Sequence, residues 1–253
     1  MGRRPHPRHA RARPAEGGRV RLYGRHAVEA ALANPARRAL KLFATHEAAA
    51  RLAPPAGLAV QLGDGADLAR LVPADAPHQG LVLEVEPLEG AFLEELLASP
   101  DPRRPLLLLD QVTDPMNVGA IIRSAAAFGA AGLITQDRHA ASESGALARA
   151  AAGALERVPW ARVVNLARAL DEVAEAGFWR IGLAGEAATA LAQALPAGSL
   201  ALVLGAEGEG LRHNTRAHCD MLARLPITSA VESLNVSTAA AVALYAAATR
   251  QEG

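Results

Sequence analysis

The chain has 253 residues, 51% apolar and 3% aromatic, and its 26 basic residues balance its 26 acidic ones, so no overall field selects nucleic acid or a membrane. Its length suffices for one large domain or two unequal ones, and the single cysteine, Cys219, excludes a disulfide framework and a cysteine-based metal cluster. No apolar run approaches the roughly 18 residues of a membrane span and no signal-peptide pattern is present, so we expect a soluble, cytoplasmic protein with no membrane partner.

The first 21 residues carry a local excess of positive charge. They contain seven arginines against Glu16 alone, which leaves the remainder of the chain net acidic by six. A segment this rich in arginine and proline does not bury itself, so residues 1–21 are predicted to form a disordered basic arm. The arm either contacts phosphate groups or is a solvated tail without a partner.

A small α/β unit is predicted at 22–87. Its short apolar segments alternate between helical and strand patterns, with helices at 25–33, 47–53 and 64–72 and strands at 39–45, 57–62 and 80–86. The turn formed by His78, Gln79 and Gly80 is either a simple connection or part of a binding surface. A linker is predicted at 88–105, where a short helix precedes a stop rich in proline and arginine.

A larger α/β unit is predicted at 106–253. Continuous apolar runs typical of buried parallel strands alternate with helical stretches; the strands lie at 105–110, 131–136, 180–185, 200–205 and 222–227, and the helices at 117–129, 143–155, 166–177 and 236–250. This alternation indicates a doubly wound parallel sheet. In such folds ligands bind beyond the carboxyl ends of the strands.

The first loop that leaves a strand at this edge opens a helix. Asp114 is a good N-cap and Pro115 suits the first helical position, which places Asn117 in the first turn. Gly119 would let a ligand or another chain approach closely, and Arg123 lies one turn further on the same face. The alternative is a capped helix with one exposed arginine.

The second loop, "LVLGAEGEGLR", holds three glycines after an apolar strand. Its spacing, G-x-x-G-x-G, differs from the dinucleotide-binding motif GxGxxG. The chain also contains no phosphate-binding GxxxxGK[ST] loop, so the sequence does not favour ATP or GTP hydrolysis. Glu207 lies among these glycines. Its carboxylate either points into a site or belongs to an ordinary turn.

The third loop, "VESLNVSTAAA", places five polar residues before the last apolar helix: Glu232, Ser233, Asn235, Ser237 and Thr238. Capping by Ser233 or Asn235 explains one or two of them. The remainder predict a polar pocket at a helix N-terminus, where unpaired N–H groups receive oxygen atoms of a ligand.

Together the three loops resemble the motifs of the SpoU branch of the SPOUT RNA methyltransferases. The motifs occur in the family's order as "NVGAIIRSAAAFGA", "LVLGAEGEGLR" and "LPITSAVESLNVSTAAA". The stretches "YGRHAVEAAL" and "HQGLVLEVEP" are similar to the ribosomal-protein-like RNA-binding domain of the subgroup that methylates guanosine in large-subunit rRNA. The resemblance covers nearly all of the chain after residue 21.

The resemblance implies transfer of a methyl group from S-adenosylmethionine to a ribose 2′-hydroxyl, without a metal. It implies a knotted (trefoil) SPOUT α/β domain, a homodimer and an RNA partner. The polar active-site set carried over from the family is Asn117, Arg123, Glu207, Ser233 and Asn235. The cofactor-binding set is Gly205, Leu225 and Leu234, with Thr135, Leu204 and Ile227 beside them.

Positioning and electrostatics carry the expected mechanism. Arg123 is expected to hold a substrate phosphate through both arms of its guanidinium and to lower the pKa of the 2′-hydroxyl, because a guanidinium is a poor base. Asn117, Glu207, Ser233 and Asn235 are expected to orient Arg123 and the ribose. Two alternatives stay open: methylation of tRNA or of another rRNA site, including the kind that confers antibiotic resistance, and a catalytically silent RNA-binding protein of ribosome assembly.

Overall fold

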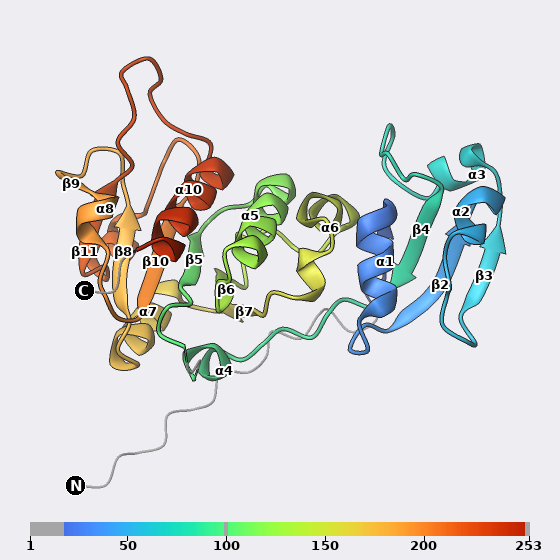
Figure 1. Cartoon of the computed structure of the whole chain (residues 1–253), viewed down its shortest axis with the longest axis horizontal. Coiled ribbons are helices and arrows are strands. Elements are labelled where there is room, and N and C mark those ends of the chain that lie inside the picture. Colours follow the sequence, from blue (N-terminus) through green and yellow to red (C-terminus); the bar gives the residue numbers. More distant parts are fainter. Residues whose placement is uncertain (1–17, 99–100, 251–253) are drawn as a thin grey trace, which may run out of the picture.

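The computed structural model describes residues 18–98 and 101–250 and contains two β-sheets (Figure 1). A four-stranded sheet lies near the N-terminal end of the sequence and a seven-stranded sheet follows it. Helix α6 lies between the two parts of the molecule, beside α5 on one side and α1 on the other (Figure 1). Most of the predicted basic arm, residues 1–17, lies outside the described residues.

The N-terminal sheet is mixed and has the strand order β1-β4-β2-β3. Strand β4 is antiparallel to β1 and β2, and β2 is parallel to β3. The elements are β1 (Val20–Tyr23), α1 (Arg25–Ala33), β2 (Ala39–Ala44), α2 (His46–Ala50), β3 (Ala59–Leu62), α3 (Gly65–Ala69) and β4 (Leu81–Val85).

Strand β1 corrects the predicted boundary of the arm. It includes Val20 and Arg21, which the sequence analysis assigned to the disordered segment. Arg19 and Arg21 both form ion pairs with Glu84 on β4, at 2.8 and 3.5 Å. Of the arginines that suggested a solvated arm, Arg19 and Arg21 therefore lie at an ordered edge strand, where their charge is paired.

The predicted linker packs onto the C-terminal unit. It contains α4 (Leu93–Leu97), whose Leu93 and Leu96 are buried in the same cluster as residues of the larger sheet. Ala91 forms a parallel bridge with Ala161. The segment after residue 90 therefore covers one face of the second sheet.

All strand pairs of the larger sheet are parallel, in the order β7-β6-β5-β10-β8-β11-β9. The parallel α/β architecture expected from the sequence is confirmed. Its strands are β5 (Leu106–Asp110), β6 (Gly132–Gln136), β7 (Trp160–Val163), β8 (Trp179–Leu183), β9 (Thr189–Ala190), β10 (Leu200–Gly205) and β11 (Met221–Arg224). Its helices are α5 (Pro115–Ala127), α6 (Gly145–Ala151), the 3₁₀ turn η1 (Ala154–Glu156), α7 (Leu166–Glu175), α8 (Leu191–Ala194), α9 (His213–Ala217) and α10 (Val236–Ala248).

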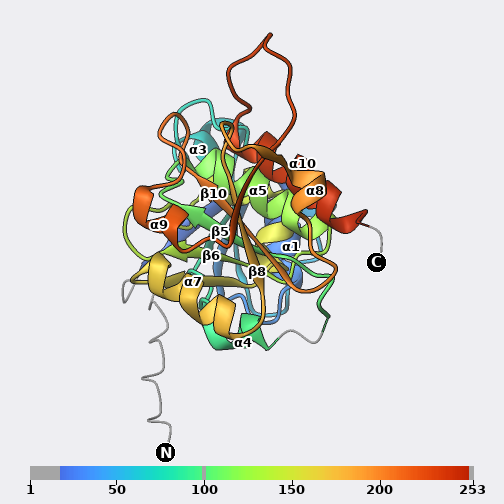
Figure 2. The same cartoon turned by 90° about the vertical axis from the view of Figure 1, so that its left-hand side faces the viewer.

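Helices cover both faces of this sheet, with α5 and α10 on one side and α7 and α4 on the other (Figure 2). Alternate leucines of β5 enter different clusters: Leu107 and Leu109 pack with α5 and α10, whereas Leu106 and Leu108 pack with α7. All four are at most 1% exposed. Burial on both faces explains the unbroken apolar run, and each such side chain contributes about 1.5–3 kcal/mol.

Gly119 serves close packing of α5 against α6. A Cβ atom at this position would lie 2.4 Å from the carbonyl oxygen of Leu147 and 2.6 Å from the Cβ of Ala150. The sequence predicts the approach of a ligand or another chain at this glycine, and that prediction is wrong. The neighbour is α6 of the same chain, so Gly119 fixes the position of the helix that carries Asn117.

Candidate active site

Three loops converge beyond the carboxyl ends of the central strands. One follows β5 and opens α5, one follows β10, and one follows β11 and opens α10. Strand β10 lies between β5 and β8, and β11 lies next to β8. Because all these strands are parallel, their following loops meet at one edge, as the sequence analysis predicted.

A closed set of hydrogen bonds joins one side chain from each loop. The Nδ2 of Asn117 donates to Oε1 of Glu207 at 3.2 Å. The Nδ2 of Asn235 donates to Oδ1 of Asn117 at 3.0 Å and also to Oε1 of Glu207. We call these three residues the polar ring. Its members come from all three predicted motifs, and they hold the loops to one another.

Asn235 is held in place from its other end. Its Oδ1 accepts hydrogen bonds from the backbone amides of Ser237 and Thr238, so it is the N-cap of α10, and it also accepts from the hydroxyl of Ser237 at 2.6 Å. The cap fixes which atom of the amide faces the helix and leaves Nδ2 directed at the ring. Asn235 therefore both caps α10 and joins the three loops.

The glycines of the second loop let the chain turn back tightly on itself. The backbone amide of Gly210 donates to the carbonyl of Ala206 at 2.9 Å. A Cβ at Gly205 would lie 2.0 Å from the carbonyl carbon of Gly210, and Gly208 and Gly210 have φ angles of +80° and +66°. The contact at Gly205 excludes a side chain, and the positive φ angles at Gly208 and Gly210 favour glycine. The turn presents Glu207 at its tip.

Asp110 anchors this loop, a role that sequence reasoning missed. Its side chain is fully buried, and its carboxylate accepts from Nε of Arg212 at 2.7 Å, from the Arg212 amide at 3.1 Å and from Gln136 at 2.9 Å. The charge-assisted pair joins the end of β5 to the end of the glycine loop. The available signal was an acidic residue that ends an apolar strand and an arginine that ends the second motif.

Arg123 does not join the polar ring. Its side chain is exposed and, among the described residues, forms no hydrogen bond or ion pair. It follows Asn117 by six residues, which puts it about 9 Å further along α5 and on another face. The expectation that Asn117, Glu207 and Asn235 orient Arg123 is therefore not met within one chain.

The loop after β11 has the features of a cofactor cradle. Leu225 and Leu234 are half-buried, Ser233 is exposed, and Ile227 exposes 41% of its surface. Ile227 lies outside the strands, and within the described residues its backbone forms no hydrogen bond to another backbone group. Free amides and carbonyls beside apolar side chains fit the adenosine and amino-acid ends of S-adenosylmethionine, and the adjoining ring supplies polar partners.

Two residues of the predicted cofactor set lie inside the core. Leu204 is 2% exposed within the apolar cluster. The hydroxyl of Thr135 is buried and accepts a hydrogen bond of 2.9 Å from Nε1 of Trp160. Strand β5 separates Thr135 from β10. Neither side chain is brought to the loops, whereas Gly205 lies at the start of the glycine turn.

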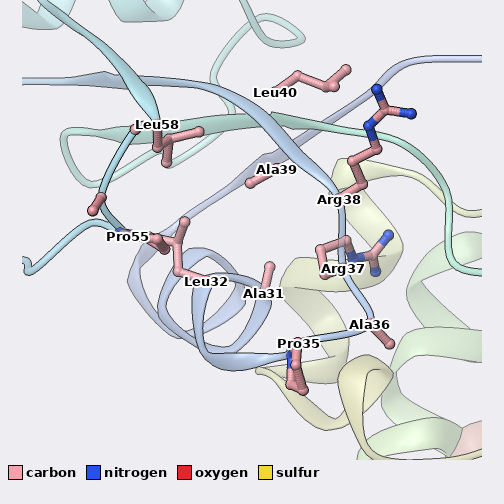
Figure 3. A pocket seen from close by; sticks show the side chains of 12 residues that line it. Ala31, Leu32, Pro35, Ala36, Arg37, Arg38, Ala39, Leu40, Pro55 and Leu58 are labelled. Carbon is pink, nitrogen blue, oxygen red and sulfur yellow. The ribbon is translucent and has the colours of Figure 1, made fainter.

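Other parts of the described chain offer no competing catalytic set. A cavity of about 510 Å³ lies in the N-terminal unit, between the end of α1 and the segment before β3, and no residue of the predicted site lines it (Figure 3). No group of three or more His, Cys, Asp or Glu among the residues placed by the structure could hold a metal ion. No helix in that part is long and apolar enough to cross a membrane.

Comparison with protein families agrees with this geometry. Residues 104–245 match the model of the SpoU rRNA Methylase family, and residues 21–91 match the model described as RNA 2'-O ribose methyltransferase substrate binding. The first match covers more than half of the chain. The chain belongs to the SpoU rRNA methylase family.

Two curated relatives match over nearly their whole length. The 23S rRNA (guanosine-2'-O-)-methyltransferase RlmB of Pseudomonas aeruginosa is 40% identical over 235 residues, which cover 89% of this chain and 94% of that protein. The RlmB protein of Escherichia coli K12 is 39% identical, with 89% and 96% coverage. The resemblance to the guanosine-methylating subgroup, stated from the motifs, is confirmed.

Solved structures share the two-part architecture. The SpoU methyltransferase AviRb of Streptomyces viridochromogenes superposes with a TM-score of 0.78 at 25% identity, covering 94% of this chain and 91% of that one. The same protein in complex with the cofactor AdoMet superposes with a TM-score of 0.76 at 25% identity, covering 92% and 90%. The α/β fold with its N-terminal substrate-binding domain is thus confirmed.

Proposed function

We propose that this protein is an S-adenosylmethionine-dependent RNA ribose 2′-O-methyltransferase that acts on a guanosine of large-subunit (23S) rRNA. The observation that carries the proposal is the polar ring, which unites Asn117, Glu207 and Asn235 from three loops at the ligand-binding edge of the sheet. The RlmB relatives, which match over most of their length, support the guanosine and the rRNA.

The ring offers one acceptor atom to a ligand. Oε1 of Glu207 receives the amide donors of both asparagines, whereas its Oε2 forms no hydrogen bond among the described residues. In this proposal Oε2 accepts a hydrogen bond from a donor group of the ribose or of the cofactor. When bound, S-adenosylmethionine supplies the methyl group on its sulfonium. The ring then holds the 2′-hydroxyl in line with that carbon, and such positioning supplies up to ~7–11 kcal/mol.

Arg123 is assigned to the substrate phosphate. A guanidinium is a poor base, so Arg123 stabilises negative charge and holds two oxygen atoms at once, and the hydroxyl proton leaves to a phosphate oxygen or to water. Arg123 does not contact the polar ring of its own chain. This supports an active site in which Arg123 of one subunit completes the polar ring of the other. Ser233, exposed two residues before the ring's Asn235, is assigned to the ribose or the cofactor.

Three exposed arginines without an ion pair support an RNA-binding surface where the N-terminal and C-terminal units meet. Arg123 on α5, Arg138 after β6 and Arg149 on α6 are exposed and form no ion pair within the described residues. The Cγ of Arg149 would lie 3.8 Å from a Cβ at Gly24, which places it against the N-terminal unit. Because only 3% of residues are aromatic, phosphate contacts dominate base stacking.

A homodimer is part of the proposal. Helices α5 and α10 pack side by side and expose apolar side chains: Met116 is 46%, Val242 43% and Tyr245 58% exposed. A second copy that covers this face would bury them near the ring. A cytoplasmic location follows from the proposed substrate.

Mapping of ribose methylation in total RNA from cells with and without this protein tests the substrate. We expect that one guanosine of large-subunit rRNA carries a 2′-O-methyl group in cells with the protein and lacks it in cells without the protein. A site lost in tRNA instead would replace the substrate, and an unchanged methylation map, together with no calorimetric binding of S-adenosylmethionine, would favour the silent RNA-binding protein.

A further inference from the structure

A buried arginine joins the two units of the molecule. Arg37 lies between α1 and β2 in the N-terminal unit, and its side chain is 0% exposed. Its Nε and one terminal nitrogen donate to the two oxygens of Glu156 at 3.2 and 2.6 Å, and the other terminal nitrogen donates to Glu143 at 2.5 Å and to the carbonyl of Glu86 at 3.0 Å. Both carboxylates belong to the C-terminal unit.

Neighbouring groups complete this set. The amide of Asn34 donates to Glu156 at 2.8 Å, and the backbone amide of Leu88 donates to Glu143 at 2.9 Å. We call Asn34, Arg37, Glu143 and Glu156 the Arg37 cluster. The carboxylate side chains are only 6% and 4% exposed, so solvent screens these charges much less than it screens a surface pair. A bidentate buried pair of this kind fixes geometry more strictly than a surface ion pair.

The Arg37 cluster holds the C-terminal unit on both sides of α6. Glu143 comes immediately before Ser144, the N-cap of α6, and Glu156 lies in η1 just after the helix. Helix α6 in turn packs on α5 at Gly119, where no side chain fits. The cluster is therefore connected, through one helix, to the helix that carries Asn117 and Arg123.

Glycines bring the N-terminal unit equally close to α6. A Cβ at Gly145 would lie 2.3 Å from the carbonyl oxygen of Arg21 and 2.4 Å from the ring of Tyr23. A Cβ at Gly153 would lie 2.9 Å from the Cβ of Ala30. Contacts this tight limit sliding of the N-terminal unit along α6, and they leave its orientation to the contacts at the two ends of that helix.

We propose that Arg37 is a positioning residue for methyl transfer: through Glu143 and Glu156 it fixes the orientation of the RNA-binding unit relative to the polar ring, and so the placement of the bound nucleotide. The inference rests on the proposed function for its substrate. Its physical reason is that an error of 1 Å at the reacting atoms costs about 100-fold in rate. RNA held by a unit free to rotate would meet the ring in many orientations.

Three variants separate this role from folding. Arg37→Met removes the cation and strands two buried carboxylates, which is destabilising in itself. The triple variant Arg37→Met/Glu143→Gln/Glu156→Gln removes all three charges and leaves no buried charge unpaired, so we expect it to keep the fold while the ion pairs are lost. Arg38→Met is the matched control, because Arg38 is the next residue but its side chain is 73% exposed and pairs with Glu86; Figure 3 shows the two arginines side by side.

The primary readout is the distance between spin labels on the two units. Cysteines at Arg70, the C-cap of α3, and at the exposed Val164 after β7 carry the labels, in a Cys219→Ala background. We expect a narrow distribution in the natural chain and in Arg38→Met, and a broad one in the triple variant. A narrow distribution in the triple variant would overturn the inference. This measurement requires no methylation, so it decides the Arg37 cluster even if the proposed substrate is wrong.

Kinetics then connect orientation to chemistry. For a large-subunit rRNA fragment we expect kcat/KM of the triple variant to fall by about 100-fold. The Kd for S-adenosylmethionine should equal that of the natural chain, because the cofactor loops lie wholly in the C-terminal unit. A triple variant that methylates at the natural rate, or that loses cofactor binding as well as RNA methylation, would contradict a positioning role.

Discussion

The side-chain amide of Asn235 donates a hydrogen bond of 3.0 Å to Oδ1 of Asn117 across 118 residues of chain. The two amides belong to the first turns of α10 and α5, and both donate to Glu207. These three hydrogen bonds thus fix two helix N-termini and the glycine turn relative to one another. The arrangement makes the geometry of the site depend on residues that also stabilise the fold.

Two substitutions of Asn235 separate capping from catalysis. Asn235→Ser keeps an N-cap oxygen but loses both donations to the ring, whereas Asn235→Ala loses the cap as well. We expect Ala to lower the free energy of unfolding by about 1 kcal/mol and Ser to leave it nearly unchanged. Both should reduce kcat for RNA methylation to the same low level. Urea unfolding and methyl-transfer assays measure the two effects, and a Ser variant with natural activity would remove Asn235 from the site.

Arg123→Lys tests bidentate contact with phosphate. The variant keeps the charge but loses the fork, so we expect kcat/KM to fall by about 100-fold without a change in unfolding free energy. Arg168→Lys is a suitable control, because Arg168 lies on α7 and pairs with Glu172. Steady-state methylation with an rRNA fragment provides the comparison. Near-normal turnover by Arg123→Lys would show that charge alone suffices there.

Tyr245→Arg tests the proposed dimer. Tyr245 is 58% exposed on α10 and contacts Phe128 edge to face, so a charged replacement leaves the monomer folded but opposes burial against a second copy. We expect light scattering to give a dimer for the natural chain and a monomer for the variant, with RNA methylation lost. The control is Val164→Arg, at a position that is 88% exposed after β7. A natural chain that is monomeric and active in RNA methylation would contradict the proposed homodimer.

Cys219 gives a pH dependence with a definite sign. Burial raises the pKa of this thiol from 9.0 to about 11, and its Sγ donates to the carbonyl of Thr215 at 3.3 Å. Above pH 9 the unfolded chain loses this proton while the folded chain keeps it, so the free energy of unfolding falls as the pH rises toward 11. We expect a loss of about 2 kcal/mol that the Cys219→Ala variant lacks. Urea titrations across this range check it, and parallel curves for the two proteins would refute it.

The alternation of apolar strands and helices was sufficient to predict the parallel sheet and the meeting of three loops. The hydrophobic pattern did not predict elements that are too short to show a clear periodicity. Strand β9 has two residues, α8 and α9 have four and five, and β1 alternates arginine with apolar residues, so it resembled the arm. Strand β7 ("WARV") was overlooked because its four residues include an arginine.

Long-range contacts account for the remaining differences. Sequence spacing did not indicate that Gly119 faces Leu147, that Asp110 accepts from Arg212 or that Arg37 pairs with Glu156. Each of these contacts depends on how whole elements pack. The trefoil knot and the dimer came from the family resemblance alone, and they stay predictions.

The most direct test of the account is methyl transfer in vitro. The purified chain is incubated with S-adenosylmethionine carrying a labelled methyl group and large-subunit rRNA, and the digested RNA is analysed for 2′-O-methylguanosine. We expect label in that nucleoside at a single site, and loss of the label with Glu207→Gln, which replaces the free acceptor Oε2 by a donor. Label on a base, no label at all, or full activity of Glu207→Gln would contradict it.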